Sequence, residues 1–202
     1  MRKGLDHDVI IAEAVAMIEE GGYDSFSLRE LAKRLGVKPA SLYNHLDGAK
    51  EIAAAVAMKA AEGMGNALRE AMKDKAADEA FVAGALAYRR FAEQNRELYK
   101  ALIMMPSIDD ERVREAGFRS FAPMRELIHE YITDFNDALN FHRAFRSVIH
   151  GFIELTSNGF MTRGGVSRDE TYLIIVNEYL SVLKRYVGKC KELVTNDEGV
   201  SG

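Results

Sequence analysis

The sequence lacks the features of a disulfide-stabilised, secreted or membrane-spanning protein. Its single cysteine, Cys190, has no second cysteine in the chain to pair with, which favours a reducing compartment and argues against a redox sensor. No apolar run approaches the ~20 residues that a membrane-spanning helix needs. The N-terminal MRKGLDHD has no apolar stretch behind its charges and is not a secretory signal. We therefore expect a cytoplasmic protein that does not engage a membrane.

Proline is also scarce, with 3 residues in a chain of 202, and long stretches are therefore free of helix-breaking positions. Ala, Leu, Glu, Lys and Arg dominate the composition, and these residues favour helix. Hydrophobic residues make up 48% of the chain, enough for a sizeable core. We find no internal repeat, no low-complexity segment and no strand-like alternation. These observations predict an all-α fold of one domain or two small ones.

The formal net charge of −4 argues against a general nucleic-acid coat protein, but the charges are unevenly distributed. Between residues 27 and 50, basic residues outnumber acidic ones, with Arg29, Lys33, Arg34, Lys38 and Lys50 against Glu30 and Asp47. A small basic patch on an acidic body suits local, specific binding of a polyanion.

Residues 27–46, SLRELAKRLGVKPASLYNHL, have the pattern of two short helices joined by a tight turn. Ser27 and Glu30 have the spacing of a capping box, in which each side chain bonds the backbone N–H of the other residue. Gly36 stands where a left-handed residue ends the first helix, and Pro39 suits the first turn of the second. This is the helix-turn-helix pattern, whose second helix enters the major groove of DNA.

Apolar residues at helical spacing predict further helices on both sides of this unit. Their expected ranges are 8–20, 49–73, 79–95, 97–104, 111–120, 123–135, 140–161 and 168–187. The long helix from residue 49 would connect two domains. We expect a helix-turn-helix DNA-binding domain over residues 1–50, a helical effector-binding and dimerisation domain over 51–190, and a disordered tail over 191–202.

The N-terminal part resembles the tetracycline-repressor (TetR) family of transcriptional regulators. The resemblance rests on AVAMIEEGGYDSFSLRELAKRLGVKPASLYNHLDGAKEI, which combines a helix, a Gly-Gly-Tyr-x-x-Phe-Ser turn, the two-helix unit and Leu-Tyr-x-His-Leu. FHRAFRSVIHGFIELTSNGF is similar, more weakly, to the start of a family dimerisation helix. The resemblance implies a homodimer that binds a palindromic operator through its N-terminal domains. It also implies a small-molecule pocket in the C-terminal domains, which pair through a four-helix bundle.

The resemblance and the exposed pattern of the helix-turn-helix together indicate which residues bind double-stranded DNA. The resemblance implies that Tyr43 and His45 contact phosphates, that Ser41 contacts phosphate or base, and that Pro39 and Ala40 touch bases. Asn44 could read adenine, and Arg29 could reach a phosphate or a base edge. The expected DNA-binding residues are Ser27, Arg29, Lys38, Pro39, Ala40, Ser41, Tyr43, Asn44, His45 and Lys50.

Each of these interpretations has a structural alternative. Tyr43 could be a core aromatic residue, and His45 and Asn44 could be ordinary solvated side chains. Two positions also depart from the family pattern. Lys38 replaces the Ser or Thr that often caps the recognition helix, and Ala49 replaces a Lys that often begins the fourth helix. Arg2 and Lys3 fit either a minor-groove arm or a frayed terminus.

The C-terminal part offers a candidate pocket and a candidate dimer interface. An apolar or amphipathic effector would be bound by Phe91, Met104, Met105, Phe118, Phe121, Met124, His150 and Glu154, although core packing explains each apolar residue singly. Residues 168–187 are apolar on two adjacent stripes, one of Tyr172, Val176, Tyr179 and Leu183 and the other of Leu173, Ile174, Leu180 and Val187. One stripe would meet a second subunit, the alternative being a central helix of a monomeric core. The expected interface is Phe145, Ile149, Phe152, Tyr172, Val176, Tyr179 and Leu183.

The leading hypothesis is a one-component repressor that binds its operator as a dimer and is released by a small-molecule effector. The alternative is an effector-independent activator or architectural protein. Two hypotheses of another class are an interaction adaptor and a small enzyme that uses His142, His150 and Glu154. We expect no cofactor, no catalytic residues and no metal, because a metal site needs three or more converging ligands and nothing else in the sequence points to one.

Overall fold

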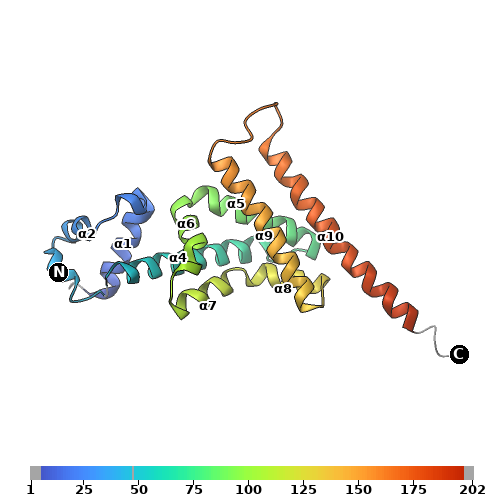
Figure 1. Cartoon of the computed structure of the whole chain (residues 1–202), viewed down its shortest axis with the longest axis horizontal. Coiled ribbons are helices and arrows are strands. Elements are labelled where there is room, and N and C mark those ends of the chain that lie inside the picture. The colour runs from blue at the N-terminus through green and yellow to red at the C-terminus, as the bar shows by residue number, and fades with distance from the viewer. Residues whose placement is uncertain (1–5, 47, 198–202) are drawn as a thin grey trace. The chain divides into compact units, whose positions relative to one another are not determined.

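A computed structural model describes residues 6–46 and 48–197, with the side chains of residues 24 and 187–197 left out. Arg2 and Lys3 lie outside the described residues, as do residues 198–202 of the expected tail and the side chain of Cys190. All regular structure in the described part is helical, as the coiled ribbons of Figure 1 show. The all-α prediction is confirmed. Among the described residues, no helix combines the length and the apolar character needed to cross a membrane.

The helices form two compact units that the chain enters twice each. The first unit covers residues up to 64 together with 94–120 and contains α1 (His7–Gly21), η1 (Tyr23–Ser25), α2 (Leu28–Leu35), α3 (Pro39–Leu42), most of α4 (Ala49–Met72), α6 (Arg96–Met104), η2 (Met105–Ser107) and α7 (Glu111–Ser120). The second covers 65–93 and residues from 121 on, and contains α5 (Ala77–Gln94), α8 (Ala122–Tyr131), α9 (Phe135–Ser157) and α10 (Arg168–Asp197). The first unit thus extends beyond the expected domain of residues 1–50.

In the first unit, α1 begins and ends at residues suited to those positions. The Asp6 carboxylate caps the helix by accepting a hydrogen bond from the Val9 backbone N–H at 2.8 Å. Gly22 ends it with a φ of 80°, a conformation that disfavours side chains with a Cβ. Ile10 and Ile18 on the inner face are fully buried. α1 therefore provides the apolar face against which α2 and α6 pack.

The boundaries of the later helices differ from the sequence prediction, because local capping chemistry overrides periodicity. The expected helix over 123–135 ends at Tyr131, where Ile132 is extended. Asp134 then caps α9 by accepting a hydrogen bond from the Asp137 backbone N–H at 2.9 Å. α9 therefore begins earlier than residue 140, and it ends before Gly159, whose φ is 83°. α10 continues to Asp197, so the prediction of a disordered tail is wrong for residues 191–197.

The core of the second unit is aromatic and includes one buried polar anchor. The rings of Phe81 and Phe145 lie 4.8 Å apart between centroids, and Tyr179 lies 5.1 Å from Phe145. Tyr172 is fully buried, and its hydroxyl donates a hydrogen bond to the Ala85 carbonyl at 2.7 Å. This bond joins α10 to α5 inside the core, where an unpaired hydroxyl would cost stability.

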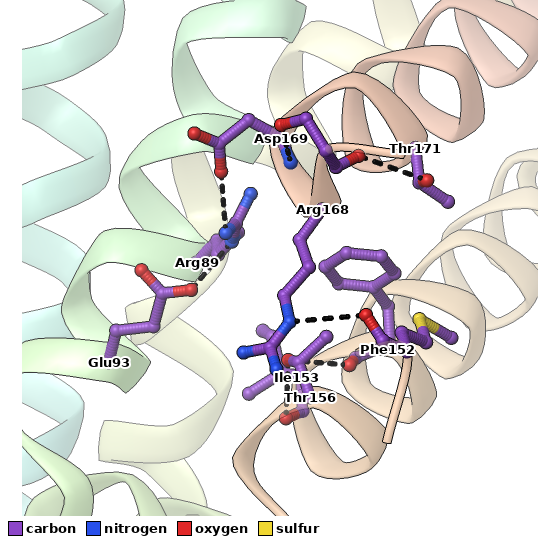
Figure 2. Close-up of polar contacts among 10 residues, drawn as sticks. Arg89, Glu93, Phe152, Ile153, Thr156, Arg168, Asp169 and Thr171 are labelled. Carbon is purple, nitrogen blue, oxygen red and sulfur yellow. Dashed lines mark hydrogen bonds and ion pairs between the residues drawn. The ribbon is translucent and has the colours of Figure 1, made fainter. Parts of the chain in front are cut away.

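Arg89 on α5 holds the first turn of α10 in place. Its guanidinium lies 2.8 Å from the Asp169 carboxylate and 2.6 Å from that of Glu93, as Figure 2 shows. The same guanidinium lies 5.1 Å from the centroid of the Tyr172 ring and 5.4 Å from that of Phe152. Ion pairs and cation–π contacts thus converge on one largely buried cation.

This core overturns the choice of dimer-interface residues. The predicted interface residues pack inward, because Phe145, Ile149, Phe152, Tyr172, Val176 and Leu183 are buried within their own unit and Tyr179 packs edge-on against Phe141. Ile174, on the other apolar stripe of α10, is instead 62% exposed. The sequence correctly shows two stripes, but periodicity does not indicate which one faces the core.

Candidate DNA-binding surface and effector site

The predicted DNA-binding residues share one property in the structure, which is that they lie at the surface of the first unit. All of them are exposed except the half-buried Ser41. Tyr43 is 62% exposed and is therefore not the core aromatic residue of the alternative interpretation. Leu42 and Leu46 between them are buried, and they fix the segment to the unit. The chain thus presents polar and basic side chains on a rigid apolar base.

The first helix of the motif has the predicted ends, but its capping box is only half formed. The Ser27 hydroxyl accepts a hydrogen bond from the Glu30 backbone N–H at 3.1 Å. The Glu30 carboxylate accepts a hydrogen bond from Lys33 at 3.0 Å instead of capping Ser27 in return. Gly36 has a φ of 69° and a ψ of 31°, the left-handed conformation that ends a helix.

The second helix of the motif is shorter than the sequence predicts. α3 has 4 residues and ends at Leu42, after which the backbone continues as a turn through residues 43–45. Lys38 stands at the N-cap position and makes no side-chain capping bond, in keeping with the loss of the usual Ser or Thr there. Pro39 occupies the first turn, where its missing N–H costs nothing. Tyr43, Asn44 and His45 are therefore carried by a turn instead of a regular helix.

Ion pairs divide the basic residues of the motif into two groups. Arg34 binds Glu20 through two hydrogen bonds, of 2.6 and 2.9 Å, and also pairs with Glu13. Lys33 pairs with Glu30 on the next turn of its own helix. Within the described part of the chain, Arg29, Lys38 and Lys50 form no such pair. These three cations are the ones available to a phosphate backbone. The sequence analysis did not make this distinction, because the carboxylates on α1 are distant in the chain.

The second unit contains a hollow lined by side chains from α4, α5, α8 and α9. The lining residues are Leu68, Tyr88, Phe121, Met124, His142, Phe145, Arg146 and Ile149. Its surface is apolar apart from the Tyr88 hydroxyl, the imidazole of His142 and the guanidinium of Arg146. An apolar hollow with a few polar groups is the usual form of a small-molecule site.

Most of the predicted effector residues lie elsewhere. Phe121 and Met124 line the hollow, but Phe91 is buried in the core beside it. In the first unit, Met105 is buried, whereas Met104 and Phe118 are 59% and 67% exposed. On α9, Glu154 is exposed and neither it nor His150 lines the hollow. The prediction is corrected for these six residues, because sequence proximity to the proline at position 106 does not determine which helix faces meet.

The polar group that does face the hollow on α9 is His142. Burial, followed by the positive charges of Arg146, Arg125 and Arg143, lowers the pKa of His142 to about 4. Its ring lies 6.2 Å from that of Phe121, and Arg146 lies 4.1 Å above the Phe121 ring. The i, i+4 spacing of His142 and Arg146 on an otherwise apolar stripe is the sequence signal that could have identified them.

The structure also bears on the metal and enzyme hypotheses. Among the described residues, no group of three or more His, Cys, Asp or Glu side chains is placed to hold a metal ion. His142 and His150 lie on one helix, and only His142 reaches the hollow. No arrangement of a nucleophile, a base and an orienting residue is present there.

Comparison with known proteins agrees with this geometry. Residues 10–56 match the bacterial regulatory proteins of the tetR family, and residues 81–179 match the tetracyclin repressor-like C-terminal domain. An HTH-type transcriptional regulator of Mycobacterium tuberculosis is 30% identical over 158 residues, which are 78% of this chain and 72% of that protein. The chain belongs to the TetR family. It is therefore a DNA-binding transcriptional regulator, and its relatives are regulators and not enzymes.

Two further relatives place this TetR-family protein in context. Over 45 residues, 22% of this chain and 24% of the relative, it is 44% identical to the negative transcriptional regulator of the biofilm operon icaADBC in Staphylococcus aureus. A protein of unknown function from Rhodococcus sp. RHA1 has a similar structure, with a TM-score of 0.76 and 26% identity. That match covers 90% of this chain and 97% of the other. The TetR-like arrangement of an N-terminal helix-turn-helix and a helical C-terminal part thus extends over most of the chain.

Proposed function

We propose that this TetR-family regulator is a dimeric repressor that binds a palindromic operator and is released by a small apolar or amphipathic molecule. The observation that carries the proposal is the surface of the first unit, where the predicted DNA-binding residues are exposed together around the buried Leu42 and Leu46. A surface that is rigid, basic and free of competing ion pairs is suited to the phosphate backbone.

In this proposal, the DNA contacts are divided between positioning and reading. Arg29, Lys38 and Lys50 would contact phosphates, because their charges are not neutralised by carboxylates of the described chain. Tyr43 and His45 would bond phosphate oxygens from the turn that follows α3. Ser41 and Asn44 would reach base edges. Pro39 and Ala40 have no hydrogen-bonding side chains and would contribute close approach and contact with thymine methyl groups.

The proposed dimer uses the outer faces of α9 and α10. Ile174 on α10 is accompanied on α9 by Val148 and Leu155, which are 38% and 43% exposed. Val148 and Leu155 are seven residues apart and share a helix face. Between them, a Cβ on Gly151 would meet nothing within 4 Å, so this position could allow a second helix to approach closely. An apolar face with a small residue at its centre is suited to pairing with its own copy.

Release would follow from a shift between conformations, in which the effector binds better when the recognition elements are out of register. Two copies reading half-sites one helical turn apart must hold a spacing of about 34–36 Å. For a typical coupling of ~1–3 kcal/mol, operator affinity would fall roughly 5- to 150-fold. In the first unit, α6 packs on α1, where the Glu97 carboxylate lies 3.1 Å from the position of a Cβ on Gly22. This close contact is one route by which α6 could act on the DNA-binding helices.

Selection of bound DNA from a random pool tests the DNA-binding part directly. We expect a palindromic consensus, and we expect Lys38→Ala and Tyr43→Ala to weaken binding to it in a gel shift. Lys33→Ala is the matched control, because Lys33 is already paired with Glu30. A reporter with the selected operator across its promoter should be expressed less when the protein is present. Increased expression would indicate an activator, and a non-palindromic site would contradict the dimeric mode of binding.

A further inference from the structure

His142 connects the apolar hollow to a second one on the same unit. The second hollow is lined by Arg125, His129 and Phe135 among others, and His142 lines both. The His129 and Phe135 rings stack with a centroid separation of 6.3 Å, and Phe135 is exposed. The imidazole of His142 is therefore the partition between an inner apolar space and an outer space that is open to solvent.

The side chains around this partition are positive or apolar, and no Asp or Glu is among the residues that line either hollow. Arg146 is half-buried, and one face of its guanidinium is covered by the Phe121 ring at 4.1 Å. Among the described residues, no carboxylate forms an ion pair with it. Partial burial of a cation without a counter-charge is unfavourable, and an anion in the hollow would compensate it. The N–H groups in the guanidinium plane have the geometry to bind a carboxylate in a bidentate manner.

The pKa values support an excess of positive charge at this point. The pKa of His142 is lowered by burial and then by Arg146, Arg125 and Arg143, and no carboxylate acts in the opposite direction. Burial also lowers the pKa of the Arg125 guanidinium, with only the neighbouring Glu126 opposing it. At neutral pH, His142 is uncharged and its ring can donate one hydrogen bond. The site thus offers donors and positive potential at the partition.

The inner hollow is suited to an apolar group. Leu68, Met124 and Ile149 line it, and the Met124 side chain is unbranched and flexible. On the neighbouring α5, Gly84 has no Cβ, and one placed there would lie 2.7 Å from the Met124 terminal methyl group. The methionine therefore occupies space that only a glycine leaves open, and displacement of this side chain would enlarge the hollow.

We propose that the two hollows form one site for an amphipathic organic anion, with its apolar tail in the inner hollow and its carboxylate bound by Arg146, His142 and Arg125. This inference rests on the proposed function, because it specifies the chemical class of the effector. It excludes cationic amphiphiles, which the same side chains would repel. Neutral molecules of the same length would bind without the charge-assisted hydrogen bonds.

Isothermal titration of the full chain with three ligands of matched tail tests the proposal. The probes are decanoate, decanol and decyltrimethylammonium, each below its micelle concentration. We expect decanoate to bind at least about 10-fold more tightly than decanol, and decyltrimethylammonium not to bind. Equal affinities for decanoate and decanol, or binding of the ammonium compound, would overturn the inference.

Variants locate the binding to the proposed residues. Arg146→Gln and Arg125→Gln should each weaken decanoate about 10- to 100-fold and leave decanol unchanged, whereas Arg146→Lys, which keeps the charge, should weaken it less. Arg90→Gln on the exposed face of α5 is the matched control and should have no effect. Thermal unfolding of each variant shows that it is folded. Unchanged decanoate affinity in both Gln variants would overturn the inference.

Competition with the selected operator separates this inference from the proposed function. If decanoate binds through Arg146 and Arg125 but does not release DNA, the anion site stands and release by this ligand class fails. If decanol or the ammonium compound releases DNA while decanoate does not bind, release by an effector stands and the anion site is overturned. Release by decanoate that is lost in Arg146→Gln supports both.

Discussion

Tyr172 and Ala85 are 87 positions apart in the chain, and the tyrosine hydroxyl donates a hydrogen bond of 2.7 Å to the alanine carbonyl inside the core of the second unit. The contact fixes α10 against α5 next to the ion pairs of Arg89 (Figure 2). Burial raises the pKa of the Tyr172 hydroxyl far above its ordinary value, so the group is a neutral donor at all physiological pH values.

Replacement of Tyr172 by phenylalanine should lower the free energy of unfolding by about 1 kcal/mol, the usual net value of one hydrogen bond. The loss stays small because phenylalanine keeps the ring and the Ala85 carbonyl keeps its bond within the helix. Urea denaturation measures the change. Tyr179→Phe is the control, because its hydroxyl makes no hydrogen bond among the described residues, and a comparable loss there would contradict the explanation.

The ion-pair pattern of the first unit predicts different salt dependence for different cations. The slope of log affinity against log salt should fall by about 0.9 for each phosphate contact that is lost, and by twice that in a dimer. Arg29→Gln and Lys38→Gln should therefore reduce the slope. Lys33→Gln and Arg34→Gln should leave it nearly unchanged, because their charges are already paired with glutamates. Fluorescence anisotropy at several salt concentrations distinguishes the two groups, and identical slopes in all four variants would refute the assignment.

The exposed face of α9 and α10 predicts which substitution separates the proposed dimer. Ile174→Glu places a charge in the contact, and we expect a monomer by sedimentation together with a loss of operator affinity. The variant should fold normally, since Ile174 is 62% exposed in the single chain. Asn177→Glu, one turn along α10 and also exposed, serves as a charge-matched control. A dimer that survives Ile174→Glu would place the interface elsewhere.

His142 predicts that acid destabilises the second unit. Its pKa is about 4 in the folded chain against an ordinary value of 6.5, so the unfolded chain binds the proton first as the pH falls. The free energy of unfolding should therefore decrease between these values, by at most about 1.4 kcal/mol per pH unit from this group. His142→Gln should flatten that part of the curve in urea denaturation.

His7 has the opposite sign and serves as the comparison. Hydrogen bonds to Glu51, at 2.6 Å, and to Asp8 raise its pKa. Its contribution to stability is therefore complete below its ordinary value of 6.5 and is lost as the pH rises through the folded pKa. His7→Gln should reduce stability mainly at the acidic end. The two variants should shift the pH profile in opposite directions, and a shift in the same direction would contradict the charge environments described here.

The sequence by itself determined the features that depend on local chemistry. Helical periodicity and the scarcity of proline determined the all-α class. Ser27, Gly36 and Pro39 determined the ends of the two motif helices, because capping and turn conformations involve neighbours within a few residues. The TetR family is legible in the same short segment for the same reason. Even here, the prediction was wrong where a second local signal competed, as at Asp134, which begins a new helix inside a stretch that periodicity alone would join.

The tertiary structure decided which faces meet. Two apolar stripes on α10 are equivalent to a periodicity argument, and only the position of α5 and α9 shows that Tyr172, Val176 and Leu183 face inward. In the same way, Arg34 is neutralised by Glu20, while Arg29 is not, because α1 folds back beside one of them. The hollow around His142 combines side chains from four helices. Burial and charge pairing depend on contacts between distant segments, and these contacts arise only when the helices pack.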